Sequence, residues 1–328
     1  MNTQLILDQY DEFDFAGVDR EARRQHSRGY KKRQQNGKGQ PGASAARIIE
    51  IAETITDMDD SEGSWVPSYA APMDSKHHER YWLIDSVAPF YRDNLITDVT
   101  RLVKGGKEAN VYACTAHPAM GLEMIAAKLY RPRMLRNLKN DAVYKAGRQL
   151  RDAEGKQLKG RREKLAIRKK TDFGKEVDIQ WWIGNEYMTQ TTLYEAGADV
   201  PKPIAHQGNT ILMAFIGDEH GAAPTLSEIR LPADEAQPLF RRTMENIALM
   251  LDNHLIHGDL SAYNILYWDG RITLIDFPQM VDARKNPHAF DLLHRDITRV
   301  CDYYGRYGIH TDPQQLTLDL WQPYMREG

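Results

Sequence analysis

The sequence is poor in cysteine and has no long apolar run. Only two cysteines, Cys114 and Cys301, occur among 328 residues, and two thiols by themselves form neither a disulfide framework nor a zinc site. No apolar run approaches the roughly 18 residues of a membrane-spanning helix, and the first residues lack the basic-then-apolar pattern of a signal peptide. We therefore expect a soluble, reduced, cytoplasmic protein without a membrane partner.

An excess of charge of one sign is also missing. The 43 Lys and Arg residues against 46 Asp and Glu residues leave a net charge of −3, which excludes a histone-like polybasic protein. Hydrophobic residues make up 41% of the chain and aromatic residues 9%, enough for a sizeable core. Length alone allows one large or two small domains.

Two segments are nevertheless strongly basic. Residues 20–40 hold eight basic residues and one acidic residue, and residues 131–175 hold 16 and five. The first segment has almost no apolar residues, which predicts a mobile arm. The second far exceeds the usual connection of about 4–6 residues, which predicts a mobile insert. Each segment either binds a phosphate-rich polymer such as RNA or is simply solvated, and the sequence leaves both readings open.

Hydrophobic spacing predicts mostly strands early in the chain and mostly helices later. The expected helices are 48–55, 81–95, 181–196 (stopped by Gly197) and 240–251; the expected strands are 98–103, 111–115, 123–130, one near Ile204, 210–216 and a pair around an Asp269–Gly270 turn. An acidic stretch at 57–72 is expected to be a linker. This order favours an α+β protein with an extension (1–79, partly disordered), an N-lobe (80–216) and a C-lobe (217–328), hinged near 215–221.

The most informative stretch is His257-Gly-Asp-Leu-Ser-Ala-Tyr-Asn264, followed by Leu274-Ile-Asp276. Asp259 and Asn264 lie five residues apart in a loop, and Asp276 ends a short strand. Phosphoryl transfer needs this set, because one carboxylate orients the attacking hydroxyl and accepts its proton while an amide and a second carboxylate hold Mg²⁺. The alternative is a polar loop followed by a hairpin. We expect His257 to support the loop rather than to donate a proton.

Upstream residues supply the rest of a phosphate-binding site. In Lys104-Gly-Gly-Lys-Glu-Ala-Asn-Val-Tyr112, Gly105 and Gly106 let the backbone approach phosphates. Lys128 lies in an apolar strand, where an unpaired ammonium is costly, and Glu186 on the following helix is its expected partner. Alone, the glycines indicate only a turn and Lys128 only an edge-strand lysine. With the downstream loop, a Lys–Glu pair that positions nucleotide phosphates is favoured.

Together these motifs resemble the RIO family of atypical protein kinases. The resemblance covers about residues 80–307 and rests on the segments 106–112, 200–204, 213–217, 257–264 and 274–279. The phosphate loop is similar to the first RIO subfamily, whereas 275–281 is closer to the second, whose winged-helix domain is not evident in the extension. We therefore expect the first subfamily, in a bacterial branch. The resemblance implies a two-lobed kinase-like fold, with an antiparallel N-lobe sheet plus helix and a mostly helical C-lobe lacking activation and peptide-docking segments.

The resemblance also implies a role for each matching residue. Asp259 would be the catalytic base, Asn264 and Asp276 the metal ligands, and Asp276 also the acceptor of the γ-phosphate as an aspartyl-phosphate. The implied cofactors are ATP and Mg²⁺, with Mn²⁺ as an alternative. The implied nucleotide-binding residues are Gly105, Gly106, Lys107, Glu108, Val111, Lys128, Glu186, Met213 behind the adenine, and Ala214 and Ile216 through the hinge backbone. The insert matches the family's flexible loop, often self-phosphorylated on serine, but here only Tyr144 and Thr171 carry hydroxyls.

Three functions remain open at this point. The first is a Mg²⁺- and ATP-dependent serine/threonine protein kinase acting on a protein substrate or on itself. The second is an ATPase switch that docks on ribosomal RNA or a ribosome precursor through the basic segments. The third is a small-molecule phosphotransferase of the aminoglycoside-kinase type, because such enzymes share the HGDLxxxNIL loop followed by an Ile-Asp-Phe strand end.

Overall fold

The computed structural model describes residues 65–69, 77–106, 108–131 and 172–327. The basic arm at 20–40, the helix expected at 48–55, Lys107 and most of the basic insert lie outside the described residues. Within the described part of the chain, no helix is both long and apolar enough to cross a membrane.

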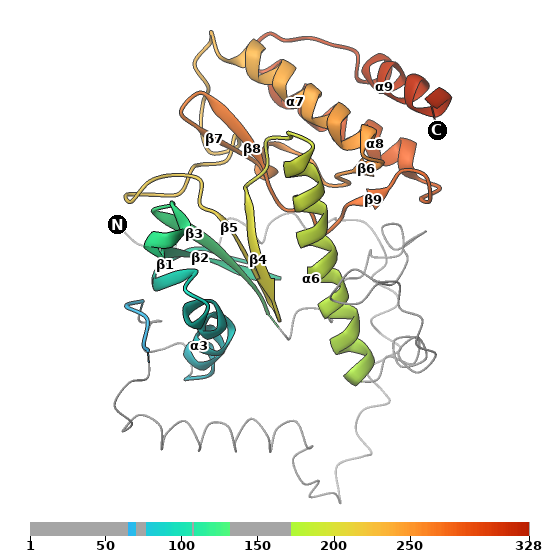
Figure 1. Ribbon diagram of the computed structural model, residues 1–328. Helices are drawn as coiled ribbons and strands as arrows, with labels where there is room; N and C mark the ends of the chain where they lie inside the picture. The colour runs from blue at the N-terminus through green and yellow to red at the C-terminus, as the bar shows by residue number, and fades with distance from the viewer. Residues whose placement is uncertain (1–64, 70–76, 107, 132–171, 328) are drawn as a thin grey trace, which may run out of the picture. The chain divides into compact units, whose positions relative to one another are not determined.

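A five-stranded antiparallel sheet forms the first half of the described fold (Figure 1). Its strands are β1 (Ile96–Gly105), β2 (Ala109–Ala116), β3 (Met124–Tyr130), β4 (Pro203–Gln207) and β5 (Thr210–Ala214), in the order β1-β2-β3-β5-β4. Alternation along β3 shows how the sequence builds it. Ile125, Ala127 and Leu129 join one apolar cluster, whereas Tyr130 joins another. Because side chains alternate along a strand, Lys128 shares the face of Tyr130.

Helix α3 (His77–Arg92) covers the first of these faces. Leu83, Val87 and Phe90 of α3 are buried in the cluster that contains Ile125. The prediction extended this helix to Leu95, which was wrong: Asn94 has a left-handed φ of 55°, and the Leu95 N–H donates to the Phe90 carbonyl. Such a helix end leaves an apolar residue packed against the helix it terminates.

Part of the predicted linker also packs on this face. The ring of Trp65 stacks on Tyr91 with centroids 4.5 Å apart, and the Tyr69 N–H donates to the Val99 carbonyl of β1. Residues 65–69 are therefore part of the sheet's apolar layer rather than a free connection.

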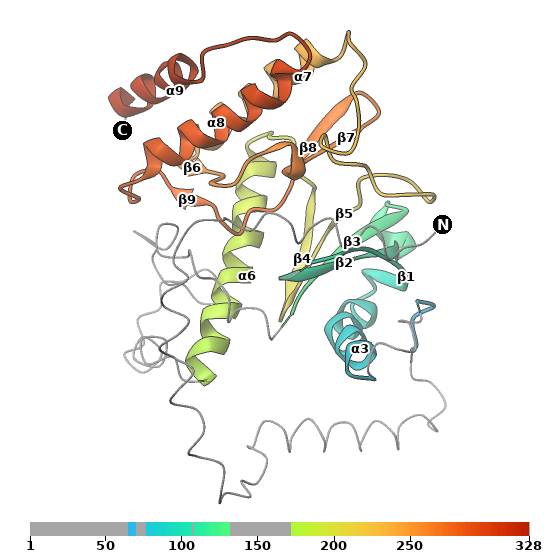
Figure 2. The same ribbon diagram turned by 180° about the vertical axis from the view of Figure 1, so that it is seen from behind.

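Helix α6 (Asp172–Glu195) covers the opposite face and continues toward the helical lobe (Figure 2). Its end before Gly197 is as predicted. Its start is nine residues earlier than the prediction of 181, so the last four residues assigned to the insert belong to the helix. Trp182 and Ile183 bury against the sheet, while Leu193 packs in the core of the following lobe.

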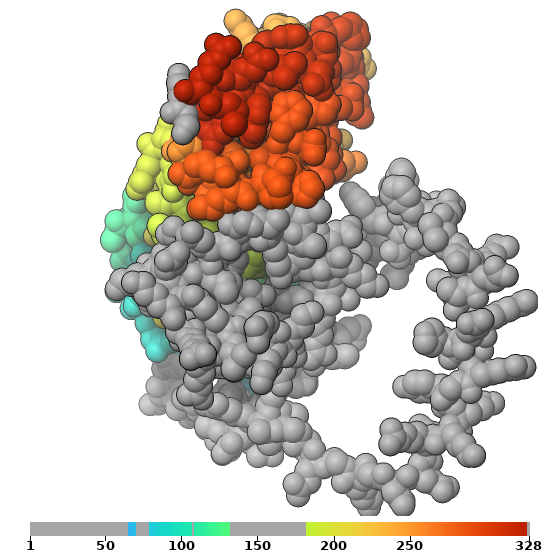
Figure 3. Space-filling model, turned by 90° about the vertical axis from the view of Figure 1, so that its right-hand side faces the viewer, coloured from blue at the N-terminus to red at the C-terminus, as the bar shows by residue number. Residues whose placement is uncertain are grey.

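The second half of the fold is mostly helical and has its own core. It contains α7 (Ala236–Asp252), β6 (Leu255–Ile256), β7 (Ile265–Trp268), β8 (Arg271–Leu274), β9 (Val281–Asp282), α8 (Ala289–Gly305) and α9 (Pro313–Glu327). As the spacing predicted, Phe240, Ile247 and Leu251 of α7 are buried together. Asp269 and Gly270, with φ of 48° and 73°, form the predicted turn between β7 and β8. The C-terminal helices, orange to red, form the coloured surface at the top of Figure 3.

Candidate active site

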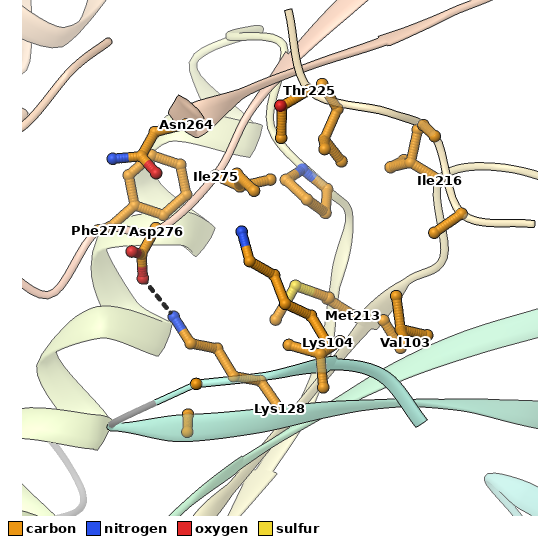
Figure 4. A pocket seen from close by; sticks show the side chains of 18 of the residues that line it. Val103, Lys104, Lys128, Met213, Ile216, Thr225, Asn264, Ile275, Asp276 and Phe277 are labelled. Carbon is orange, nitrogen blue, oxygen red and sulfur yellow. Dashed lines mark hydrogen bonds and ion pairs between the residues drawn. The ribbon is translucent and has the colours of Figure 1, made fainter. Parts of the chain in front are cut away.

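A cavity of about 810 Å³ lies between the sheet and the helical lobe. Its walls come from β1, β2, β3, β5, α6, the hinge after β5 and the segment around β7 and β8 (Figure 4). The sequence-predicted residues that line it are Gly106, Glu108, Val111, Lys128, Glu186, Met213, Ala214, Ile216, Asn264 and Asp276. Gly105 and Asp259 are not among the lining residues, and Lys107 lies outside the described part of the chain.

Lys128 is held between two carboxylates that line this cavity. Its Nζ lies 2.8 Å from Glu186 Oε1 and 2.7 Å from Asp276 Oδ1. Only 2% of the Glu186 side chain is exposed, whereas 49% of the Asp276 side chain is open to the cavity. The predicted Lys–Glu pair is therefore present, and the second carboxylate reaches it from the other lobe, 148 residues along the chain.

These contacts fix the ionisation of the three groups. Burial acts against the charged form of Lys128, but the carboxylates of Asp276 and Glu186 outweigh it and raise its pKa, so it stays an ammonium. Burial raises the pKa of Glu186 although Lys128 opposes this. Enclosure acts to raise the pKa of Asp276 too, but Lys128 reverses it, and Lys104 adds to the net lowering. Asp276 is thus an anion facing the cavity.

Asp276 also has an unusual backbone. Its φ is 71°, a left-handed value that side-chain-bearing residues rarely adopt. Residues held in such conformations cluster at functional sites, because the surrounding structure must compensate for the strain. The conformation turns the chain directly after Ile275, whose carbonyl accepts a hydrogen bond from His257 Nε2 at 3.1 Å.

His257 supports this turn in the way the sequence predicted. Its ring is 1% exposed, and burial lowers its pKa, so the ring is neutral. Nε2 donates to the Ile275 carbonyl, and Nδ1 accepts from the Asp259 N–H at 3.3 Å. One histidine thereby links the loop that carries Asp259 to the strand end that carries Asp276.

The loop around Asp259 is fixed by helix α8. The buried Asp296 carboxylate accepts from the N–H groups of Gly258 at 2.7 Å and Leu260 at 3.0 Å. Burial raises the pKa of Asp296 to about 7, although these hydrogen bonds oppose it. Asn264 Nδ2 donates to the Asp259 carbonyl at 2.9 Å, and the Asp259 carboxylate pairs with Arg299 at 2.8 Å.

The hinge begins where β5 ends at Ala214. The Ala214 N–H already donates to the Lys202 carbonyl at 2.8 Å, and the Ile216 carbonyl accepts from the Ala223 N–H at 2.9 Å. Within the described residues the Ile216 N–H has no protein acceptor, and Ile216 lines the cavity. Beyond it Gly217 bridges to Ala222, which closes the hinge into a tight turn.

Several residues of the site had not been found from the sequence. Tyr130 donates its hydroxyl to Glu186 Oε2; its position two residues after Lys128 was the available signal, since both lie on one face of β3. Asp296 and Arg299 had no local signal, because their partners are 36–40 residues away. Lys104 lines the cavity and is visible in the phosphate-loop segment.

The sheet lobe, the hinge and the helical lobe around one cavity define a protein-kinase-like fold. A crystal structure of the Rio2 kinase from Chaetomium thermophilum matches it with a TM-score of 0.50 at 18% identity, over 84% of this chain and 78% of that chain. The predicted α+β fold is thereby confirmed. The chain belongs to the RIO domain family, whose model matches residues 110–316, so the resemblance seen in the motifs is confirmed as well.

Several of the similar proteins are of the RIO1 type, and others are RIO3 kinases. "RIO-type serine/threonine-protein kinase Rio1" of Thermoplasma acidophilum is 33% identical over 135 residues, covering 41% of this chain and 69% of that protein. "Serine/threonine-protein kinase RIO1" of Homo sapiens is 30% identical over 217 residues, covering 66% of this chain and 34% of that protein. The chain thus matches about a third of the length of its human relative. The bacterial branch stays a prediction.

Proposed function

We propose that this chain is an ATP- and Mg²⁺-dependent phosphotransferase, a RIO-type serine/threonine protein kinase in which Asp276 also accepts the γ-phosphate. The observation that carries the proposal is the arrangement of Lys128 between Glu186 and Asp276 inside the cavity. It places one ammonium where nucleotide phosphates need it and one anionic carboxylate open to the same space. The predicted division into an extension (1–79), an N-lobe (80–216) and a C-lobe (217–328) is part of this proposal, except that residues 65–69 and the start of α3 at His77 are counted with the N-lobe.

The side of the cavity next to the hinge suits an adenine ring. Val111, Met213 and Ile275 give it apolar walls, and the unpaired Ile216 N–H gives it a hydrogen-bond donor at the hinge. A few directed polar groups on apolar walls are typical of cofactor sites. We place the adenine against Met213 and Ile216, with the phosphates toward Gly106 and Lys128.

Asn264 and Asp276 are the residues that would hold the metal. Asn264 commits its Nδ2 to the Asp259 carbonyl, which leaves its oxygen as an acceptor, and Asp276 is an anion. Hard oxygen ligands of this kind suit Mg²⁺, and equally Mn²⁺. When bound, the ion neutralises charge on the nucleotide phosphates.

The two aspartates are placed differently with respect to the cavity. Asp276 faces it, whereas Asp259 does not line it and is paired with Arg299. This favours the aspartyl-phosphate step: an oxygen of Asp276 bonds to the γ-phosphorus, the bond to the β–γ bridging oxygen breaks, and ADP leaves with its electron pair. Water then cleaves the acyl phosphate to carboxylate and phosphate. Transfer to a serine or threonine hydroxyl would instead use Asp259 as the base that accepts its proton.

The partners follow from the same proposal. The substrate is a protein, or the chain itself, and the basic segments 20–40 and 131–175 contact ribosomal RNA or a ribosome precursor in the cytoplasm. The ATPase-switch reading is favoured by the position of Asp276, and it predicts RNA binding that weakens steeply with salt. Deleting residues 20–40 and 132–171, which leaves helix α6 whole, would abolish that binding.

One labelling experiment tests these readings. Purified protein is incubated with Mg²⁺ and γ-labelled ATP, alongside the Asp259→Ala and Asp276→Ala variants, and the labelled protein is treated with hydroxylamine. Hydroxylamine-labile label that Asp276→Ala loses supports the aspartyl-phosphate. Stable label on serine or threonine that Asp259→Ala loses supports protein phosphorylation. Phosphate transfer to kanamycin and to no protein would overturn the proposal in favour of a small-molecule phosphotransferase.

A further inference from the structure

Two lysines of the described part of the chain face the cavity, and they differ in what they bind. Lys128 is neutralised by Glu186 and Asp276. Lys104 points its ammonium into the open cavity (Figure 4), and across the described ranges no hydrogen bond or ion pair engages it. One lysine is therefore committed to the protein, while the other is available to a ligand.

The charges that line the cavity show why this matters. From residues 65–69, 77–106, 108–131 and 172–327 they comprise two lysines, Lys104 and Lys128, and four carboxylates, Glu108, Glu186, Glu228 and Asp276. A nucleoside triphosphate brings further negative charge into this space. Because Lys128 already balances two carboxylates, Lys104 is, among the lysines whose positions the structure describes, the one left to offset the charge of a bound polyphosphate.

The position of Lys104 follows from the shape of β1. It pairs with Val111 of β2, after a register shift between Leu102 and Lys104. Bulges of this kind redirect side chains at strand ends, and both members of the Lys104–Val111 pair line the cavity. Gly105 and Gly106 follow directly, so the ammonium is carried on the strand that leads into the phosphate loop.

The ammonium of Lys104 also lies within electrostatic reach of Asp276, since it contributes to the field at that carboxylate. Asp276 is where the terminal phosphate must come if it is to be transferred. The α- and β-phosphates lie, by contrast, toward Lys128. A free cation at the end of β1 thus adjoins the part of the site that a triphosphate fills and a diphosphate does not.

We propose that Lys104 binds the terminal phosphate of a nucleoside triphosphate and so selects triphosphate over diphosphate. This inference rests on the proposed function. It assigns Lys104 a role separate from that of Lys128, whose ammonium pairs with both Glu186 and Asp276. Removal of the Lys104 charge then weakens triphosphate binding selectively, and an arginine at this position preserves it.

The test compares nucleotide affinities by calorimetry on the full chain. Dissociation constants for Mg²⁺–ADP and for a non-hydrolysable Mg²⁺–ATP analogue are measured for the wild type, Lys104→Met, Lys104→Arg and Lys202→Met. Lys202 is exposed and does not line the cavity, so it controls for the loss of one positive charge. We expect Lys104→Met to weaken analogue binding about tenfold or more and ADP binding less than about threefold. Lys104→Arg and Lys202→Met should bind both nucleotides like the wild type.

The other possible results distinguish a failure of this inference from a failure of the proposed function. If Lys104→Met loses affinity equally for both nucleotides, or for neither, Lys104 does not select the terminal phosphate. The proposed function is unaffected in that case, because the wild type still binds nucleotide. A wild type that binds neither nucleotide refutes the proposed function itself. A thermal unfolding midpoint for each variant verifies that the proteins compared are folded. The salt dependence of analogue binding gives a second readout, and it should be shallower in Lys104→Met than in the wild type.

Discussion

The guanidinium of Arg299, on α8, lies 2.8 Å from the carboxylate of Asp259 in the loop before β7. Both side chains are about 40% exposed, so an ion pair of this kind adds little to overall stability. Its consequence is geometric. Arg299 is one turn of helix beyond Asp296, which holds the backbone on either side of Asp259. Helix α8 therefore fixes both the backbone and the carboxylate of the proposed base.

Replacing Arg299 is expected to slow phosphoryl transfer without weakening nucleotide binding. In Arg299→Met the Asp259 carboxylate loses its orientation, and misplaced catalytic groups cost on the order of 10²-fold in rate. We expect kcat to fall about ten- to a hundredfold and the dissociation constant for ATP to stay unchanged, because Arg299 does not line the cavity. Arg299→Lys should recover part of the rate. Arg271→Met, at the exposed start of β8, is the control, and an Arg299→Met variant as fast as this control would contradict the prediction.

The pair of Lys128 and Glu186 gives a prediction about stability. Lys128→Met leaves the buried Glu186 carboxylate without its cation, which costs about 3–5 kcal/mol when one partner of a buried pair is removed. Adding Glu186→Gln removes the orphaned charge and should restore much of the free energy of unfolding. The double variant still lacks Lys128, so it should not bind ATP in a way that leads to phosphoryl transfer. Urea unfolding of the two single variants and the double variant measures the coupling, and strictly additive losses would show that the pair is not coupled.

Asp296 predicts a pH dependence of stability. Burial raises its pKa in the folded protein to about 7, above the ordinary value of 3.8, so the folded state holds this proton more tightly than the unfolded state. The stability that it contributes is complete below about pH 4 and is lost as the pH rises to about 7. The free energy of unfolding of the wild type, minus that of Asp296→Asn, should fall over this range by at most about 1.4 kcal/mol per pH unit.

The control for this prediction lies on the same helix. Asp291, in the first turn of α8, is exposed, and Asp291→Asn should give a profile parallel to that of the wild type. Urea unfolding at several pH values between 4.5 and 8 supplies the comparison. If Asp296→Asn also runs parallel to the wild type throughout, the raised pKa of Asp296 is wrong.

The parts of the site that the sequence predicted are those encoded by short local patterns. Alternation along β3 places Lys128 on the cavity side, the Asp269–Gly270 pair makes its turn, and the His257–Asn264 motif keeps its loop. The start of α6 was missed because the apolar residues of its sequence are spread over all sides of the helix and do not form a single stripe. The basic residues that precede it also led us to place the end of the insert four residues too late.

The residues that sequence reasoning did not find are joined by long-range contacts. Nothing near Asp296 or Arg299 in the sequence indicates that α8 lies under the loop of Asp259, because that contact exists only after the C-lobe core has formed. Lys104 differs, because it belongs to the phosphate-loop segment identified from the sequence. That its side chain faces the cavity depends on the register shift in β1, which the sequence does not indicate. The motifs thus predicted the residues that carry the chemistry, whereas the residues that hold them in position could be identified only from the tertiary structure.

Gly217 gives the sharpest test of the hinge. Its φ is 132°, and a Cβ there would lie 2.8 Å from the Ala223 nitrogen and 2.9 Å from the Ala222 Cα. Gly217→Ala must therefore open the turn that follows Ile216, whose N–H we assign to the adenine. We expect a loss of at least about 2 kcal/mol in stability and more than tenfold weaker ATP binding, measured at 10 °C, where the variant remains folded. At Gly221, in the same turn, a Cβ would meet nothing within 4 Å, so Gly221→Ala should match the wild type in both. Equal affinities for Gly217→Ala and Gly221→Ala would mean that the adenine does not depend on this hinge.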